Sequence, residues 1–261
     1  MSDASPFSLR GKVVVQFGGT GLLGRALVSS LGAAGATLVV ASRNRTALEA
    51  LAAAEQQAQR RVEIEEVDIA SQASLQALRD RVFQQHGRVD GIVFNAVHRA
   101  MKGFAGPLEG WAASMATNAT GFFATARTFG DAMAARGSGS IVNIASHMGM
   151  VGVNPWLYEE TGANPSPDYF FHKGGMINVT RYLAAHYGAK GVRANVVSPG
   201  GIYNPDKPQA AEFINRYGKM TALGRMAQAR EVGGAVVFLL SDASSYVTGI
   251  NLPVDGGYTA K

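Results

Sequence analysis

Short apolar runs alternate along the chain with longer stretches in which apolar residues recur every three or four positions. Short runs rich in β-branched residues and bounded by glycine are typical of strands buried in a parallel sheet, and the longer stretches are typical of amphipathic helices. The pattern predicts strands at residues 12–17, 36–42, 61–67, 89–95, 140–146, 192–198 and 249–255, and helices at 22–34, 44–59, 71–86, 110–136, 169–189 and 228–240. This alternation indicates a doubly wound α/β fold, in which a seven-stranded, mostly parallel sheet has helices on both faces.

Three segments show neither pattern, namely residues 97–109, 147–168 and 199–220. Each follows the carboxyl end of a predicted strand, which is the edge where ligands bind in open α/β sheets. No repeat, low-complexity tract or linker interrupts the alternation, so residues 1–261 are expected to form a single domain.

The composition restricts the chemistry. The 261 residues include no cysteine, which excludes disulfides, thiolate metal sites and cysteine nucleophiles. The five histidines show no zinc-ligand spacing, so no metal is expected. The chain has no apolar leader and no apolar run near the roughly 18 residues that span a bilayer, so we expect a cytoplasmic protein without membrane contact. The formal charge of +5 is scattered, which argues against nucleic-acid binding but suits an anionic cofactor or substrate.

A glycine-rich turn follows the first predicted strand and opens the first helix. Its glycines, Gly18, Gly21 and Gly24, would permit the turn, close approach of a pyrophosphate and packing of the helix on the strand. The diphosphate of a dinucleotide would then bind at the helix N-terminus. The residues expected to contact it are Gly18, Thr20, Gly21, Leu22 and Leu23. A tight turn without a ligand is the alternative.

The end of the second predicted strand bears on which cofactor binds. Ser42 and Arg43 stand where an acidic residue would receive the ribose 2′-hydroxyl of NAD. Arg43 instead suits the 2′-phosphate of NADP, so NADP is preferred over NAD. A solvated arginine at a helix start is the alternative.

Polar residues also end the third and fourth predicted strands. Asp68 would accept a hydrogen bond from the adenine amino group, with Ile69 beside it, or equally would cap the next helix. Asn95 and Ala96 would line the cofactor ribose, and a simple turn asparagine is the alternative.

Tyr169 and Lys173 are the candidates for proton transfer. Residues four apart share one face of a helix, and an ammonium beside a phenol stabilises the phenolate. Such a phenol is a plausible acid/base for moving a proton on or off an alcohol. Taken alone, the pair equally predicts a helix with one core aromatic and one solvated lysine.

In this order, the motifs resemble those of the short-chain dehydrogenase/reductase family over nearly the whole chain. They are the glycine turn, Asp68, Asn95-Ala96, Asn118, Ser146 in IVNIAS, the YFFHK stretch at 169–173, SPGGI at 198–202 and YVTGINLPVDGG near the C-terminus. The resemblance implies a single Rossmann-fold domain that transfers hydride between NAD(P) and a secondary alcohol or ketone. It also implies a homotetramer, with a dimer as the second choice.

The resemblance assigns roles to individual residues. Tyr169 matches the catalytic acid/base, and Lys173 matches the lysine that stabilises its phenolate and holds the nicotinamide ribose. Ser146 matches the serine that hydrogen-bonds the substrate oxygen, and Asn118 matches the asparagine that organises a proton-relay water near Lys173. The stretch that covers the nicotinamide matches Pro199, Gly200 and Ile202.

The chain departs from the family pattern around the catalytic pair. Ser146 and Tyr169 are 23 residues apart, more than is usual, and the extra residues 153–168 predict a loop inserted at the substrate mouth. Tyr158 stands nearer the usual distance, but it has Gly162 in place of a lysine four residues later, so Tyr169 is preferred. Inside the Tyr–Lys interval, bulky side chains replace the usual small ones; they are Phe170, Phe171 and His172. The two phenylalanine rings would suit a subunit interface. Elsewhere, Leu22 and Val97 stand where the family usually has glycine.

Basic side chains cluster near the expected substrate mouth; they are His98, Arg99, Lys102, His147 and Lys207. If two or three converge, the substrate carries a carboxylate, phosphate or sulfonate, and scattered solvated charges are the alternative. His98 and His147, with Ser146 and Tyr169, are the expected substrate contacts.

The chain most resembles the sugar and polyol dehydrogenases of this family. The alternative enzyme is a 3-oxoacyl thioester or small-carbonyl reductase. The alternative of another class is a non-catalytic NADP-binding regulator.

Overall fold

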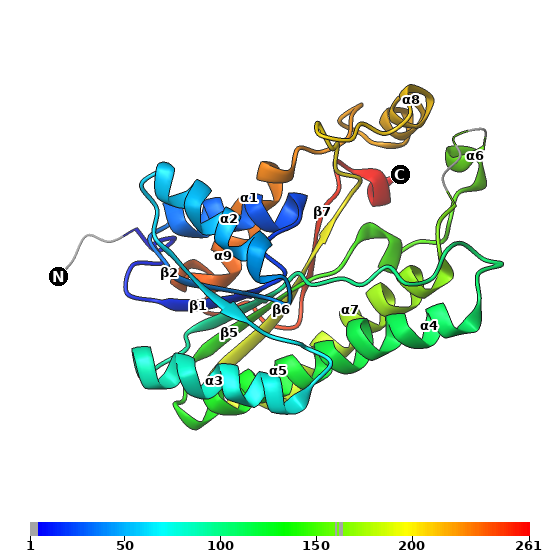
Figure 1. The fold of residues 1–261 in the computed structure, drawn as a ribbon. Coiled ribbons are helices and arrows are strands. Elements are labelled where there is room, and N and C mark those ends of the chain that lie inside the picture. The colour runs from blue at the N-terminus through cyan, green and yellow to red at the C-terminus, as the bar shows by residue number, and fades with distance from the viewer. Residues whose placement is uncertain (1–4, 160, 162–163) are drawn as a thin grey trace.

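One sheet of seven strands forms the centre of the molecule (Figure 1). The structure is a computed structural model and describes residues 5–159, 161 and 164–261. The strands are β1 (Val13–Phe17), β2 (Thr37–Ser42), β3 (Val62–Glu66), β4 (Gly91–Phe94), β5 (Gly139–Ile144), β6 (Val192–Pro199) and β7 (Asn251–Val254). They lie in the order β3-β2-β1-β4-β5-β6-β7, and every neighbouring pair is parallel. The predicted fold class is confirmed.

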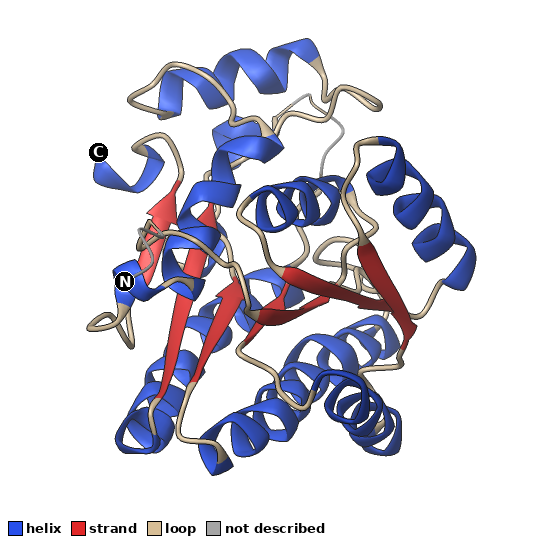
Figure 2. Cartoon of the chain, turned by 90° about the vertical axis from the view of Figure 1, so that its left-hand side faces the viewer, coloured by secondary structure: helices blue, strands red, loops and turns tan. Residues whose placement is uncertain are grey.

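Helices connect the strands and lie on both sides of the sheet (Figure 2). They are α1 (Leu22–Ala33), α2 (Arg45–Gln57), α3 (Gln72–His86), α4 (Leu108–Met115), α5 (Phe122–Ala135), α6 (Pro155–Tyr158), α7 (Pro167–Tyr187), α8 (Ala211–Met220) and α9 (Gly233–Leu240). No helix among the described residues combines the length and the apolar character that crossing a membrane requires.

Alternate residues of the strands enter two separate apolar cores. In β1, Val13 and Val15 belong to the core under α3, α5 and α7, whereas Val14 belongs to the core under α1, α2 and α9. Successive side chains of a strand point to opposite faces, so a sheet covered on both faces needs apolar residues at nearly every strand position. This requirement explains why inner strands such as β1 and β4 stand out in the sequence as nearly unbroken apolar runs. The edge strand β3, in contrast, contains three glutamates.

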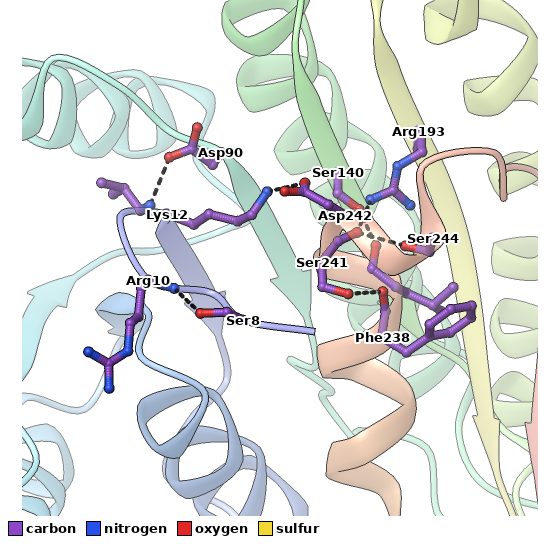
Figure 3. Close-up of polar contacts among 12 residues, drawn as sticks. Ser8, Arg10, Lys12, Asp90, Ser140, Arg193, Phe238, Ser241, Asp242 and Ser244 are labelled. Atoms are coloured by element: carbon purple, nitrogen blue, oxygen red, sulfur yellow. Dashed lines mark hydrogen bonds and ion pairs between the residues drawn. The ribbon is translucent and has the colours of Figure 1, made fainter. Parts of the chain in front are cut away.

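Polar contacts fix the edge of the sheet at which the strands begin (Figure 3). The carboxylate of Asp90, just before β4, accepts a 2.8 Å hydrogen bond from the N–H of Val13. Lys12 and Asp242 form a 2.7 Å ion pair that is mostly exposed and therefore contributes little. The buried hydroxyl of Ser140 donates a 2.8 Å hydrogen bond to the backbone of α9. Contacts within the chain thus occupy the polar groups named here at the edge where the strands begin. The opposite edge, where the strands end, is the one at which a ligand is expected.

Two predicted elements differ in the structure. A π-helical turn (Ala116–Gly121) divides the predicted helix at 110–136 into α4 and α5. This turn packs against the loop after β3, because a Cβ atom on Gly121 would lie only 2.9 Å from the backbone oxygen of Ile69. The predicted loop at 199–220 contains α8, whose Tyr217 is buried in a small separate core.

Candidate active site

A cleft of about 1340 Å³ opens at the edge where the strands end. The strand order reverses between β1 and β4, and ligand sites of α/β sheets lie at such a point. The predicted site residues that line the cleft are Gly18, Thr20, Gly21, Leu22, Leu23, Ser42, Arg43, Ile69, Asn95, Ala96, Ser146, His147, Tyr169, Lys173, Pro199, Gly200 and Ile202. Three predicted site residues, Asp68, His98 and Asn118, are not among the residues that line it.

Helix α7 brings Tyr169 and Lys173 together. The Lys173 Nζ atom lies 5.6 Å from the centroid of the Tyr169 ring and donates a 2.6 Å hydrogen bond to the backbone oxygen of Ile144, at the end of β5. Lys173 is only 3% exposed, and this burial, followed by the charge of Arg99, lowers its pKa to about 7. The Lys173 side chain is therefore held between the end of β5 and the ring of Tyr169.

Ser146 follows β5 directly and is buried at the cleft wall. Its hydroxyl oxygen accepts a 3.2 Å hydrogen bond from the N–H of Met148, which fixes the side chain at the start of a short 3₁₀ turn. The Nδ1 atom of His147 lies 3.2 Å from the backbone oxygen of Pro199. Burial lowers the pKa of His147, so this ring is neutral at neutral pH and adds no cation to the cleft.

The side chain of Asn118 lies behind the cleft wall. Its oxygen accepts a 2.8 Å hydrogen bond from the N–H of His98, and its nitrogen donates to the His98 backbone oxygen at 2.7 Å and to the Ser114 hydroxyl at 2.9 Å. Ser114 in turn donates to a carboxylate oxygen of Asp168 on α7. Asn118 therefore joins the segment after β4 to α4 and α7, and its predicted action through a water near Lys173 stays a prediction.

The glycine turn forms a cradle at the start of α1. Gly18 has a φ of +79°, and a Cβ atom there would lie 2.6 Å from the backbone of Ala96. A Cβ atom on Gly24 would lie 2.3 Å from the Gly18 backbone oxygen, so the helix packs directly on the turn. Gly21 faces open space and caps α1 without any side-chain hydrogen bond. The N-terminal N–H groups of α1 are thus directed to the cleft, as a pyrophosphate site requires.

The polar residues after β2 and β3 differ in position, because Arg43 lines the cleft and Asp68 does not. Arg43 is exposed and lines the cleft. Asp68 is exposed, and its carboxylate accepts a 3.0 Å hydrogen bond from the N–H of Ala70. The N-cap of α3 is Ser71, so the alternative prediction that Asp68 caps this helix is wrong. Its predicted contact with adenine stays a prediction.

Sequence reasoning missed two buried polar residues of α7, Asp168 and His172. They are 2% and 4% exposed, and one carboxylate oxygen of Asp168 and both ring nitrogens of His172 have no hydrogen-bond partner among the described residues. Burial, followed by the charges of Lys173 and Arg99, lowers the pKa of His172 to about 3. Asp168 and His172 are four residues apart, as Tyr169 and Lys173 are, so the sequence alone could have placed them together on one neighbouring face of the same helix.

The bulky residues between Tyr169 and Lys173 have different environments. Phe170 lines the cleft, whereas Phe171 is exposed and packs on Trp111 of α4, with ring centroids 5.3 Å apart. Phe170 is half-buried and His172 is buried, so Phe171 is the exposed residue of the three. The prediction that the two phenylalanine rings suit a subunit interface stays a prediction.

The insertion before α7 packs on α8 (Figure 1). Its residues 160 and 162–163, which include Gly162, lie outside the described residues. The Arg216 guanidinium of α8 donates hydrogen bonds to the backbone oxygens of Trp156 at 2.7 Å and Glu159 at 2.8 Å. Tyr158 lines the cleft, and burial raises its pKa to about 12.

Comparisons with known proteins agree with this geometry. Residues 21–259 match a family model described as enoyl-(acyl carrier protein) reductase. The D-threitol dehydrogenase of Mycolicibacterium smegmatis is 32% identical over 98% of this chain and 95% of its own. The 2,5-dichloro-2,5-cyclohexadiene-1,4-diol dehydrogenase of Sphingobium indicum is 36% identical over the full length of both chains. A solved gluconate 5-dehydrogenase from Burkholderia cenocepacia, in complex with NADP and tartrate, superimposes with a TM-score of 0.87 at 29% identity and covers all of both chains.

The chain belongs to the short-chain dehydrogenase/reductase family. It is a nicotinamide-dependent oxidoreductase that acts on CH–OH groups, as the resemblance in the sequence implies.

Proposed function

We propose that the enzyme interconverts a secondary alcohol of a polyol, sugar or sugar acid with its ketone, using NADP, and that Tyr169 is the acid/base. One observation carries the proposal: in the cleft, the Tyr169 phenol lies beside a buried Lys173 ammonium that is anchored to the end of β5. A protonated Lys173 stabilises the phenolate, so Tyr169 can take a proton from an alcohol or return it to a ketone. Ser146 would donate a hydrogen bond to the substrate oxygen and stabilise the charge that develops there.

The chain's own residues suit a nicotinamide dinucleotide. The glycine cradle and the N-terminus of α1 would hold the pyrophosphate, and Asn95 and Ala96 would line the ribose. Lys173 would hold the nicotinamide ribose, and the backbone from Pro199 to Ile202 would cover the nicotinamide. When bound, the nicotinamide supplies the hydride acceptor for oxidation or the hydride donor for reduction. Asn118 would act as a positioning residue, because its amide orders the backbone next to Arg99.

Arg43 supports the preference for NADP. It is exposed in the cleft after β2, and the described residues of the cleft wall place no carboxylate beside it to receive a ribose 2′-hydroxyl.

Replacing Arg43 with alanine should lower kcat/KM for NADP by about ten- to a hundredfold, because a charge-assisted hydrogen bond to the 2′-phosphate is lost. The kcat/KM for NAD should change by no more than about twofold.

Arg45→Ala is the matched control for this prediction. Arg45 is also exposed at the start of α2, but it pairs with Glu49 at 2.8 Å and is not part of the cleft wall. Steady-state kinetics with both cofactors would measure the effect. A wild-type enzyme that prefers NAD, or an Arg43→Ala variant with unchanged use of NADP, would contradict the assignment.

The substrate class rests on the named relatives, which act on a tetritol, a cyclic diol and a sugar acid. Absorbance of the reduced cofactor near 340 nm, followed with a panel of polyols, sugars and sugar acids, tests it. Turnover of 3-oxoacyl thioesters but not of this panel would favour the thioester reductase instead. Cofactor binding without turnover of any alcohol would favour the non-catalytic regulator.

Assembly as a homotetramer, or second as a dimer, is also proposed. It is supported by large apolar side chains that remain exposed around α4 and α7; they are Phe104, Leu108, Phe171 and Tyr182. Sedimentation equilibrium of the purified chain would test the assembly. A cytoplasmic location stays a prediction from the sequence.

A further inference from the structure

The charges along the cleft wall are strongly unbalanced. The cations that line it, among the described residues, are Arg43, Arg99, Lys102, Lys173 and Lys207. The one described carboxylate on the same wall is that of Asp168, which is buried and accepts a hydrogen bond from Ser114. Arg43 lies after β2, at the end proposed for the 2′-phosphate, and Lys173 belongs to the catalytic pair. The cations after β4 and β6 are left without an assigned anion.

Arg99 is the cation nearest the proposed reacting groups. Its guanidinium carbon lies 5.0 Å from the centroid of the Tyr169 ring, and its side chain is exposed in the cleft. No carboxylate of the described residues forms an ion pair with it. Burial, followed by the charge of Arg99, lowers the pKa of Lys173, in keeping with the position of this guanidinium beside the catalytic pair. Among the described residues, no acceptor takes a hydrogen bond from the Arg99 guanidinium, whose five N–H donors suit an anionic ligand.

We propose that Arg99 binds a carboxylate of the substrate, so that the natural substrate is a polyhydroxy acid rather than a neutral polyol. The inference rests on the proposed function and specifies its substrate. A guanidinium presents a planar fork of N–H donors that matches the two oxygens of a carboxylate. Because the fork lies over the ring of Tyr169, the carboxylate would sit within a few carbon atoms of the reacting carbinol.

Lys102 and Lys207 would add longer-range attraction. Lys102 follows Arg99 by three residues, and its Nζ atom lies 3.4 Å from the Arg99 backbone oxygen. Both lysines are exposed in the cleft. Exposed cations of this kind raise the encounter rate with an anion and are screened by salt. The apparent KM for an acid should therefore rise with ionic strength, whereas that for a neutral polyol should not.

Arg99 has one competing role, in which it acts only through Tyr169. A cation over the ring would help to stabilise the phenolate without touching the substrate. The two roles predict different effects on acidic and on neutral substrates. An effect through Tyr169 lowers turnover of acids and neutral polyols alike, whereas a carboxylate contact affects the acids alone and chiefly through KM.

The experiment compares pairs of compounds that differ only in a terminal group. Gluconate and sorbitol form one pair and threonate and threitol another, because a carboxylate in the first replaces a hydroxymethyl group in the second. Wild type, Arg99→Met and Arg99→Lys are assayed with NADP at low and high salt, and tartrate is tested as a competitive inhibitor. Arg127→Met is the matched control, because Arg127 also lies over an aromatic ring, that of Phe123, at 5.7 Å and is not part of the cleft wall.

We expect wild type to use the acid of at least one pair better than its neutral partner. Arg99→Met should lose about ten- to a hundredfold in kcat/KM for that acid and in tartrate affinity, with the neutral partner changed by less than about threefold. Arg99→Lys should recover part of the loss, because it keeps the charge but not the fork.

Two results would overturn the inference while the proposed function stands. One is equal use of acid and neutral partner by wild type, and the other is an equal loss for both in Arg99→Met. A loss of the same size in Arg127→Met would also overturn it. Turnover of no member of the wider panel of polyols, sugars and sugar acids would overturn the proposed function itself, and the inference with it.

Discussion

Tyr169→Phe should lower kcat by about 10²- to 10⁴-fold, the range that a positioned acid/base supplies. The substitution removes the phenol oxygen and leaves the ring, which packs beside His172 at 5.2 Å and under Arg99. The fold and the cofactor cradle should therefore be unaffected, and NADPH binding, followed by fluorescence titration, should stay within about twofold of wild type. Single-wavelength assays near 340 nm with saturating substrate measure the loss in kcat.

Tyr158→Phe is the control for this loss. Tyr158 lines the same cleft and has a buried hydroxyl, but no lysine is placed beside it, and its pKa is raised rather than suited to proton transfer. This variant should keep at least about a tenth of the wild-type kcat, since no proton-transfer role is lost. The opposite ranking of the two variants would transfer the acid/base role to Tyr158 and remove the basis of the proposed mechanism.

Lys173→Met should abolish turnover and yet stabilise the folded chain. Burial lowers the pKa of Lys173 to about 7 in the folded state from an ordinary value of 10.5, so below pH 7 the folded state bears the full cost of a buried ammonium. Methionine fills a similar volume without that charge. At pH 6 we expect a gain of about 1–3 kcal/mol in the free energy of unfolding, after the loss of the hydrogen bond to Ile144 is subtracted.

The stability difference between Lys173→Met and wild type should also depend on pH. Between pH 7 and 10.5 the unfolded state binds a proton at Lys173 that the folded state does not, so wild-type stability rises with pH relative to the variant. The advantage of Lys173→Met should shrink by about 1.4 kcal/mol per pH unit above 7. Urea denaturation of both proteins from pH 6 to 9 would measure it. A variant that is less stable at pH 6, with a difference independent of pH, would show that Lys173 stays charged throughout.

The sheet could be predicted because its chemistry is local. The inner strands, such as β1 and β4, are buried on both faces, so their apolar runs are nearly continuous. A glycine or a polar residue follows at the edge where the strands end. The Tyr169–Lys173 pair could be predicted for the same reason, because residues four apart on a helix must share a face. In both cases the signal lies within a single strand or helix and does not depend on contacts with distant segments.

The parts that could not be predicted depend on contacts between distant segments. The π-helical turn at 116–121 is packed against the loop after β3. Its weak helix formers, which include Thr117, Asn118 and Gly121, do not by themselves specify a π-helical turn. Asn118 has a motif position that suggests catalysis, but its side chain is hydrogen-bonded to His98 and Ser114 and is not part of the cleft wall. Helix α8 was missed although Phe213, Ile214 and Tyr217 recur at helical spacing; these residues pack in a small core with the insertion.

The attachment of the insertion to α8 has a consequence for redesigning this enzyme. Arg216 is 8% exposed, and besides its hydrogen bonds to the insertion backbone, its guanidinium lies 5.5 Å from the ring of Trp156. Exchanging either segment alone for that of a homologue would remove the backbone acceptors of the Arg216 Nη1 atom or leave the two backbone oxygens without this donor. The insertion and α8 therefore form one module, and a new specificity grafted from another dehydrogenase must be transferred as both pieces together.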